Sequence, residues 1–424
     1  MADAGAPPGR EPRAVSLPGY AVFAAMLSAA GLPIYIHAPA HYAANYGVGL
    51  TALAGILFVL RLLDVVQDPA LGWLAARLRA RRGTAVTAGV VLLAASMLGL
   101  FAVTPPVAPG LWFALTMTGL FSAFSFLTIA MYAEGVTSAG RLGRGSHLRL
   151  AGWRETGALL GVCAAAVAPT LLGDSGAPYA WFALGFAALC LVALILMRGQ
   201  WGHAGGLAPS GFGAVLSDPV SRRLLLIALM NAAPVAVSST LFLFYVESVL
   251  AARGWEGPLL VLFFLAAAAS APAWSRLAAR FGERQMLLAA MALAVASFSV
   301  VLALEAGQVA AFAAVCLVSG AALGADFAIL PALFARRMER VAPEAAAGFG
   351  LWAFVQKAAL AFAAVVLLPA LDAAGFSAAA GPANPSGALD MLTYLYALVP
   401  CVLKLGAMAL LAATPLPATA TATA

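Results

Sequence analysis

The chain has 424 residues, of which 63% are hydrophobic and only 9% are charged, and its mean hydropathy is +0.97. Soluble proteins are roughly half apolar and about a quarter charged, so this composition excludes a soluble globular protein. Because a membrane-spanning helix needs about 20 apolar residues, the chain can hold about twelve such helices with short loops. We therefore expect an all-α integral membrane protein.

Many of the basic residues gather in alternate loops. Five clusters are separated by loops that are almost free of Lys and Arg, such as 104–110 and 173–178, and only Arg253 breaks the pattern. Because basic loops stay on the cytoplasmic side, we expect both termini to be cytoplasmic, in the inner membrane of a bacterial-type cell. The net charge of +6 thus reports topology and not nucleic-acid binding. The clusters are Arg77, Arg79, Arg81 and Arg82; Arg141, Arg144 and Arg149; Arg222 and Arg223; Arg276, Arg280 and Arg284; and Arg336, Arg337 and Arg340.

Apolar runs bounded by Gly, Pro and Arg predict the membrane spans in chain order. They follow a polar cytoplasmic arm at 1–16 and precede a low-complexity tail at 413–424, which we expect to be disordered. A polar cytoplasmic loop at 199–221 divides a six-helix half at 17–198 from a second one at 222–412, an organisation typical of transporters built from parallel repeats. The predicted spans are 17–43, 50–73, 84–104, 110–135, 150–172, 178–198, 222–250, 257–277, 285–304, 308–335, 348–371 and 389–412.

The second span carries charges within an apolar sequence, FVLRLLDVVQDPALGW, which contains Arg61, Asp64 and Asp68. Charge inside a membrane is costly and usually marks a pathway or a coupling site. The two carboxylates are four residues apart, so both emerge on one helix face. Pro69 removes a helical hydrogen bond and frees a backbone carbonyl nearby. The pattern predicts a site for Na⁺ or H⁺, and structural pairing with Arg61 or Lys357 is the alternative.

The fifth span opens with Arg154 and Glu155 in the sequence RLAGWRETGALLGV. A guanidinium at this place suits binding of substrate hydroxyls or a carboxylate; a role at a cytoplasmic gate is the alternative. Tyr132 and Trp352 are candidates for stacking on a sugar ring, although aromatic residues at span ends more often form interfacial belts.

Lys357 is the only charge within the eleventh span, LWAFVQKAALAFAAVV. It needs an acidic partner, and the candidates are Asp64, Asp68 and Asp326. We expect the partner in the second span, which would tie the two halves together across a central cavity. Snorkelling of the lysine to the membrane surface is the alternative.

These features resemble the glycoside-pentoside-hexuronide cation symporter family, a branch of the major facilitator superfamily. The most specific match is RLLDVVQDPALGW, which fits the family pattern R-x2-D-x3-D-P-x2-G at 61–72. The stretches WRETGALLG, LFLFYVESVL, SGAALGADFAILPA and FGLWAFVQK agree with it. The resemblance extends from about Pro33 to the last span, and it implies a major facilitator fold with two six-helix halves.

The resemblance also implies roles for single residues. The family's cation carboxylates correspond to Asp64 and Asp68, and its fourth-span hydroxyl ligand lies near Ser125. Its coupling lysine corresponds to Lys357. Its fifth-span arginine and its fourth-span stacking aromatic correspond to Arg154 and Tyr132.

Three positions depart from the family pattern. Sugar-binding members hold an acidic residue in the first span and another in the fourth, whereas here the first span has none and Thr128 lies near the fourth-span place. The Asn that often precedes the second carboxylate is Gln67.

We therefore expect a secondary active transporter and not an enzyme, one that couples Na⁺ or H⁺ to symport of a small polar solute, such as a sugar or glycoside, by alternating access. We expect a monomer in the lipid bilayer without a bound cofactor, and no metal site beyond Na⁺ at Asp64 and Asp68. Lipid or lysolipid translocation is an alternative. Intramembrane prenyltransfer, which also uses D-x3-D helices, needs a second acidic cluster to hold metals around a diphosphate, and the sequence has only one. The candidates for substrate binding or coupling are Lys357, Arg154, Tyr132, Thr128, Trp352 and Arg61.

Overall fold

The computed structural model describes residues 14–31, 38–39, 41–43, 45–142, 146–172, 176–201 and 211–415. Within these ranges the chain forms helices and no strand. The helices are α1 (Leu17–Ala29), α3 (Leu50–Arg77), α4 (Arg82–Phe101), α5 (Pro109–Leu142), α6 (Ser146–Leu171), α7 (Pro178–Leu196), α8 (Phe212–Ser217), α9 (Pro219–Phe244), α10 (Glu256–Phe281), α11 (Glu283–Ser299), α12 (Val309–Val341), α13 (Ala346–Ala373), α14 (Ser386–Thr393) and α15 (Val399–Ala413).

In the described part of the chain, nine helical stretches are long and apolar enough to cross a membrane. Three more helices, α1, α3 and α6, supply the remaining predicted spans, and α3 carries the intramembrane charges. The predicted all-α membrane fold is therefore confirmed. The first predicted span, 17–43, the arm at 1–16 and the tail at 413–424 lie partly outside the described residues, and the limits of the two halves stay predictions.

Local sequence explains where several helices begin. Pro109, Pro178 and Pro219 each open a helix, at the position where a missing backbone N–H costs nothing. Asp218 caps α9 and accepts a hydrogen bond from the Ser221 backbone N–H at 2.7 Å, which satisfies one of the free donors of the first turn. α3 runs through Pro69 from Leu50 to Arg77 as one helix, so the proline does not break this span.

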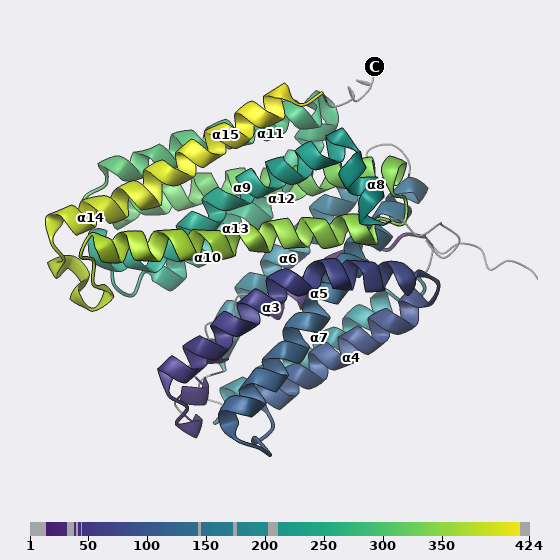
Figure 1. Cartoon of the computed structure of the whole chain (residues 1–424), viewed down its shortest axis with the longest axis horizontal. Helices are drawn as coiled ribbons and strands as arrows, with labels where there is room; N and C mark the ends of the chain where they lie inside the picture. Colours follow the sequence, from purple (N-terminus) through teal and green to yellow (C-terminus); the bar gives the residue numbers. More distant parts are fainter. Residues whose placement is uncertain are drawn as a thin grey trace, which may run out of the picture.

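Two groups of helices are visible in Figure 1, α3, α4, α5 and α7 in one and α9 to α15 in the other, with α6 at their boundary. α13 packs along α3, and α10 packs along α6. Where α3 crosses α13, a Cβ added to Gly72 would lie 3.0 Å from the Cα of Gly350. The absence of side chains at these two positions lets the backbones meet.

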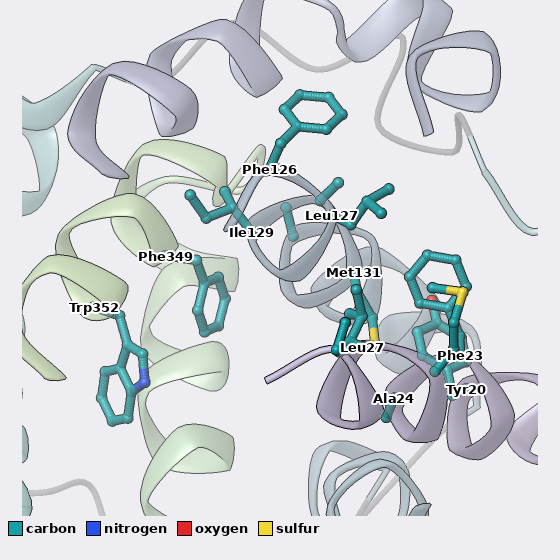
Figure 2. Close-up of a cluster of buried hydrophobic side chains, with 14 of the residues drawn as sticks. Tyr20, Phe23, Ala24, Leu27, Phe126, Leu127, Ile129, Met131, Phe349 and Trp352 are labelled. Carbon is teal, nitrogen blue, oxygen red and sulfur yellow. The ribbon is translucent and has the colours of Figure 1, made fainter. Parts of the chain in front are cut away.

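Glycines also set the close packing of α1. α1 lies against α6, where a Cβ on Gly157 would lie 2.0 Å from the carbonyl oxygen of Ala21, and one on Gly161 would lie 2.2 Å from that of Ala25. Small residues four apart allow this approach of two membrane helices. Figure 2 shows the α1 side chains Tyr20 and Phe23 in a buried cluster that also includes Leu127 and Met131 of α5.

Candidate functional site

A polar cluster joins α3, α5 and α13 in the interior. Lys357 on α13 donates hydrogen bonds to Asp64 Oδ1 at 2.6 Å, to Asp68 Oδ1 at 3.0 Å and to Ser125 Oγ at 2.6 Å. The carboxylates are almost fully buried, with 4% of Asp64 and none of Asp68 exposed. One ammonium thus binds three oxygen ligands from two other helices.

The two carboxylates of this cluster are not equivalent. Asp64 Oδ1 also accepts from Ser125 Oγ at 3.1 Å and from Gln67 Nε2 at 3.2 Å, and Ser122 Oγ in turn donates to Gln67 Oε1 at 2.9 Å. Asp68 Oδ2, by contrast, is buried and has no hydrogen-bond partner among the described residues. A buried acceptor without a donor is unusual. Within this cluster, a cation or a proton bound at this oxygen would therefore contribute the most stabilisation.

The charges of the described side chains in this cluster do not cancel. With both carboxylates ionised, Asp64 and Asp68 contribute two negative charges and Lys357 one positive charge. Buried charge that is left unpaired is costly, so a net charge of −1 favours binding of one monovalent cation. The atoms available to a cation are carboxylate and hydroxyl oxygens, the hard ligands that Na⁺ and H⁺ prefer.

The predicted contact between Lys357 and the second span is confirmed, since the ammonium reaches both Asp64 and Asp68. The competing partner, Asp326, pairs instead with Lys404 on α15. Arg61 lies on α3, and its side chain is outside the described part of the structure. Thr128 lies one turn from Ser125 but donates to the carbonyl oxygen of Phe124 in its own helix at 2.7 Å, so its hydroxyl is not joined to the cluster.

Arg154 and Tyr132 form a second buried unit. The Arg154 guanidinium lies 3.8 Å from the centre of the Tyr132 ring, and its Nε donates to Glu155 Oε1 at 2.8 Å. The Tyr132 hydroxyl donates to the same Glu155 oxygen at 3.1 Å, and the ring of Phe349 lies 4.8 Å from that of Tyr132. In this conformation Arg154 therefore binds Glu155, and Arg154 and Phe349 lie against the ring that was expected to stack on a sugar.

A central cavity of about 510 Å³ lies between the two groups of helices. Its polar lining includes Tyr132 and Glu155 on one side and Asn231, Ser239, Thr240, Asp326, Trp352 and Gln356 on the other. Figure 2 shows Trp352 and Phe349 on α13 at one side of α5. Both predicted aromatic residues, Tyr132 and Trp352, thus line this cavity.

The sequence reasoning missed a charge network at the end of the bundle that carries the basic loops, here called the basic end. Arg82 is 1% exposed and bridges Glu134 on α5, at 3.2 Å, and Glu344, between α12 and α13. His147 on α6 contacts Glu339 on α12 at 3.0 Å. Burial raises the pKa of Glu344 to about 7. These contacts join the two groups of helices at the basic end.

Comparisons with known proteins agree with this architecture. The family described as MFS/sugar transport protein matches residues 17–418, and a search of curated proteins finds no match. Among solved structures, a bacterial homologue of the iron transporter ferroportin in its outward-facing state has 14% identity and a TM-score of 0.68 over 94% of this chain and 99% of its own. The human organic anion transporter MFSD10 has 18% identity and a TM-score of 0.58, over 94% of this chain and 100% of its own.

A variant of the E. coli fucose:proton symporter, FucP, has 12% identity and a TM-score of 0.60, over 92% of this chain and 97% of its own. At these identities the likeness to solved structures establishes the fold alone. The family match excludes the prenyltransferase alternative, because the proteins it joins are transporters and not enzymes. With the fold, the intramembrane cluster and the family match in agreement, the chain belongs to the MFS/sugar transport family, the glycoside-pentoside-hexuronide type that its second span resembles.

Proposed function

We propose that this transporter couples one monovalent cation, Na⁺ or H⁺, to symport of a small hydroxylated solute by alternating access. The observation that carries the proposal is the cluster at Asp64, Asp68 and Lys357, with its net charge of −1 and its unpaired oxygen on Asp68. A buried site of this charge gains free energy when a cation enters. The fucose:proton symporter among the structural neighbours supports cation coupling as a use of this fold.

Lys357 supplies a route from cation binding to movement. Its ammonium comes from α13 and occupies the space between carboxylates of α3, so it holds the two groups of helices together at mid-membrane. An entering cation competes with the ammonium for the same oxygens. The cation binds better when the ammonium withdraws. Cation binding therefore shifts the equilibrium between the two conformations of alternating access, one with the ammonium between the carboxylates and one without it.

The lining of the central cavity supports a polar solute. Among apolar residues, its wall carries the carboxyl groups of Glu155 and Asp326 and the amides of Asn231 and Gln356, and these polar groups suit hydroxyl groups better than the acyl chain of a lipid. The basic loops support an orientation with both termini in the cytoplasm. Under that orientation the contacts of Arg82 and His147 close the cytoplasmic side.

Uptake into proteoliposomes tests the proposal. The purified protein is reconstituted, and radiolabelled neutral sugars and glycosides are offered under an inward Na⁺ gradient, an inward proton gradient or neither. We expect one of the two gradients to drive accumulation of at least one solute above its outside concentration. Accumulation that is equal with and without both gradients would contradict cation coupling, and uptake of none of the solutes would contradict the substrate class.

A further inference from the structure

We propose that Asp326 on α12 and Asn231 on α9 form a binding site for solute hydroxyl groups in the wall of the central cavity, and that Lys404 on α15 is the positioning residue behind them. This inference rests on the proposed function and deepens it, because it assigns to the second group of helices the residues that contact the solute. It involves none of the residues of the cation cluster.

The three side chains form a buried unit. Lys404 Nζ donates to Asn231 Oδ1 at 2.6 Å and to Asp326 Oδ2. Exposure is 5% for Asp326, 6% for Asn231 and 5% for Lys404. Asp326 lines the central cavity as well as a smaller cavity of about 60 Å³, whereas Lys404 lines only the smaller one. The acid therefore lies between the lysine and the central cavity.

Two acceptors at the central cavity lack donors. Asp326 Oδ1 and Gln356 Oε1 are both buried without a hydrogen-bond partner in the described structure, and both residues line this cavity. Nearly all buried polar atoms in proteins are hydrogen-bonded, so two unpaired acceptors on side chains that line one cavity favour a ligand that brings donors. A solute hydroxyl or amine supplies such donors.

Asn231 supplies the complementary group. An ammonium donates only, so the atom of Asn231 that Lys404 contacts must be the amide oxygen. The amide NH₂ is then the donating end of Asn231, and it lies close to the Asp326 carboxylate. One acceptor next to one donor matches a hydroxyl group, which both donates and accepts.

The charges at the cavity select against an anionic solute. No Lys, Arg or His occurs among the described residues that line it, and its two acids are Glu155 and Asp326. Each acid is already paired from behind, by Arg154 and by Lys404. The pair of Asp326 and Lys404 has no net charge, unlike the cation cluster, so it favours a neutral hydroxylated solute over a second cation.

Binding measurements on the full-length protein in nanodiscs test this assignment. The probes are methyl β-D-glucopyranoside, methyl β-D-galactopyranoside, D-xylose and L-fucose, with D-glucuronate as an anionic counterpart. Affinity is taken from thermal-shift titrations. We expect at least one neutral probe to bind, D-glucuronate to bind at least about tenfold more weakly, and Asp326→Asn to weaken the neutral probe by roughly 10- to 100-fold, as for loss of a hydrogen bond to a charged acceptor. The matched control Asp372→Asn, at an exposed position of α13, should leave the affinity unchanged.

A double variant separates binding from folding. Lys404→Met alone leaves a buried carboxylate without its partner and should lower the melting temperature. Asp326→Asn/Lys404→Met, which removes both charges, should recover much of the melting temperature but not the affinity, and Lys404→Arg should retain the affinity within a few fold. Recovery of affinity by the double variant, or unchanged affinity in Asp326→Asn, would overturn the inference while leaving the proposed function in place. If none of the neutral probes binds, the proposed substrate class fails and the inference fails with it.

Discussion

Replacing Lys357 with methionine removes the ammonium between Asp64 and Asp68 and keeps a side chain of similar length. The cluster then changes from a net charge of −1 to −2. Removal of one partner from a buried ion pair costs about 3–5 kcal/mol. Since 17% of the Lys357 side chain is exposed, we expect a loss of unfolding free energy at the lower end, about 3 kcal/mol.

The same geometry predicts that a cation reverses this loss. A monovalent cation that takes the place of the ammonium meets Asp64 Oδ1, Asp68 Oδ1 and Ser125 Oγ, the three atoms that Lys357 now contacts. At a cation concentration of about 100 times its dissociation constant, binding to the folded state stabilises it by about 2.7 kcal/mol. The coupling cation should therefore recover nearly all of the lost stability.

Unfolding of wild type and Lys357→Met is compared in choline chloride, in NaCl at equal ionic strength, and in choline chloride at lower pH. We expect the variant to be less stable than wild type in choline and to gain more than wild type from either Na⁺ or protons. Asp68→Asn, whose described cluster residues have no net charge, serves as the control; it should not respond to Na⁺, and at lower pH it should gain only the stability that other groups such as Glu344 contribute. If Lys357→Met is as stable as wild type in choline, or if neither cation restores it, the ammonium does not hold the carboxylates and the argument fails.

Two further predictions concern the ends of the bundle. A cysteine placed at Pro382 should react with an impermeant thiol reagent from the periplasm and one at Arg337 only from inside; the reverse pattern would refute the orientation. Glu344 should make the stability of the protein depend on pH. Its pKa rises from 4.5 to about 7 on burial, so the folded, closed form binds the proton more tightly than the unfolded form. The stability that this group contributes should then be greatest below pH 4.5 and should be lost as the pH rises to about 7. Glu344→Gln should reduce the change of melting temperature with pH over this interval. A pH profile equal to that of wild type would contradict the role of the buried Glu344 carboxyl.

The fold was predictable because its main signals are local. Apolar runs of about 20 residues, with Pro and Gly between them, place the spans without knowledge of tertiary contacts. The contact of Lys357 with Asp64 and Asp68 was predictable for a related reason. The spacing of Asp64 and Asp68 puts both acids on one helix face, and Lys357 had few acidic partners within the membrane.

Other parts of the site depend on distant packing and could not be read from the sequence. Lys404 lies 78 residues from Asp326 and 173 from Asn231, and only the arrangement of α9, α12 and α15 brings the three together. Lys404 did leave a signal, a single charge in the apolar run VPCVLKLGAMALLAA. The sequence places Arg82 in a basic cytoplasmic loop with its neighbours and gives no sign that it is buried against Glu134.

Cation binding to the purified protein tests the central claim most directly. The number of monovalent cations bound per molecule is measured for wild type and for Asp68→Asn, by calorimetric titration with Na⁺ and by proton uptake in weakly buffered solution. The cluster predicts one Na⁺ or one proton per wild-type molecule in the pH range of transport, and none at this site in Asp68→Asn. Wild type that binds neither cation, or a variant that binds the same number with the same affinity, would contradict a cation site at Asp64, Asp68 and Lys357.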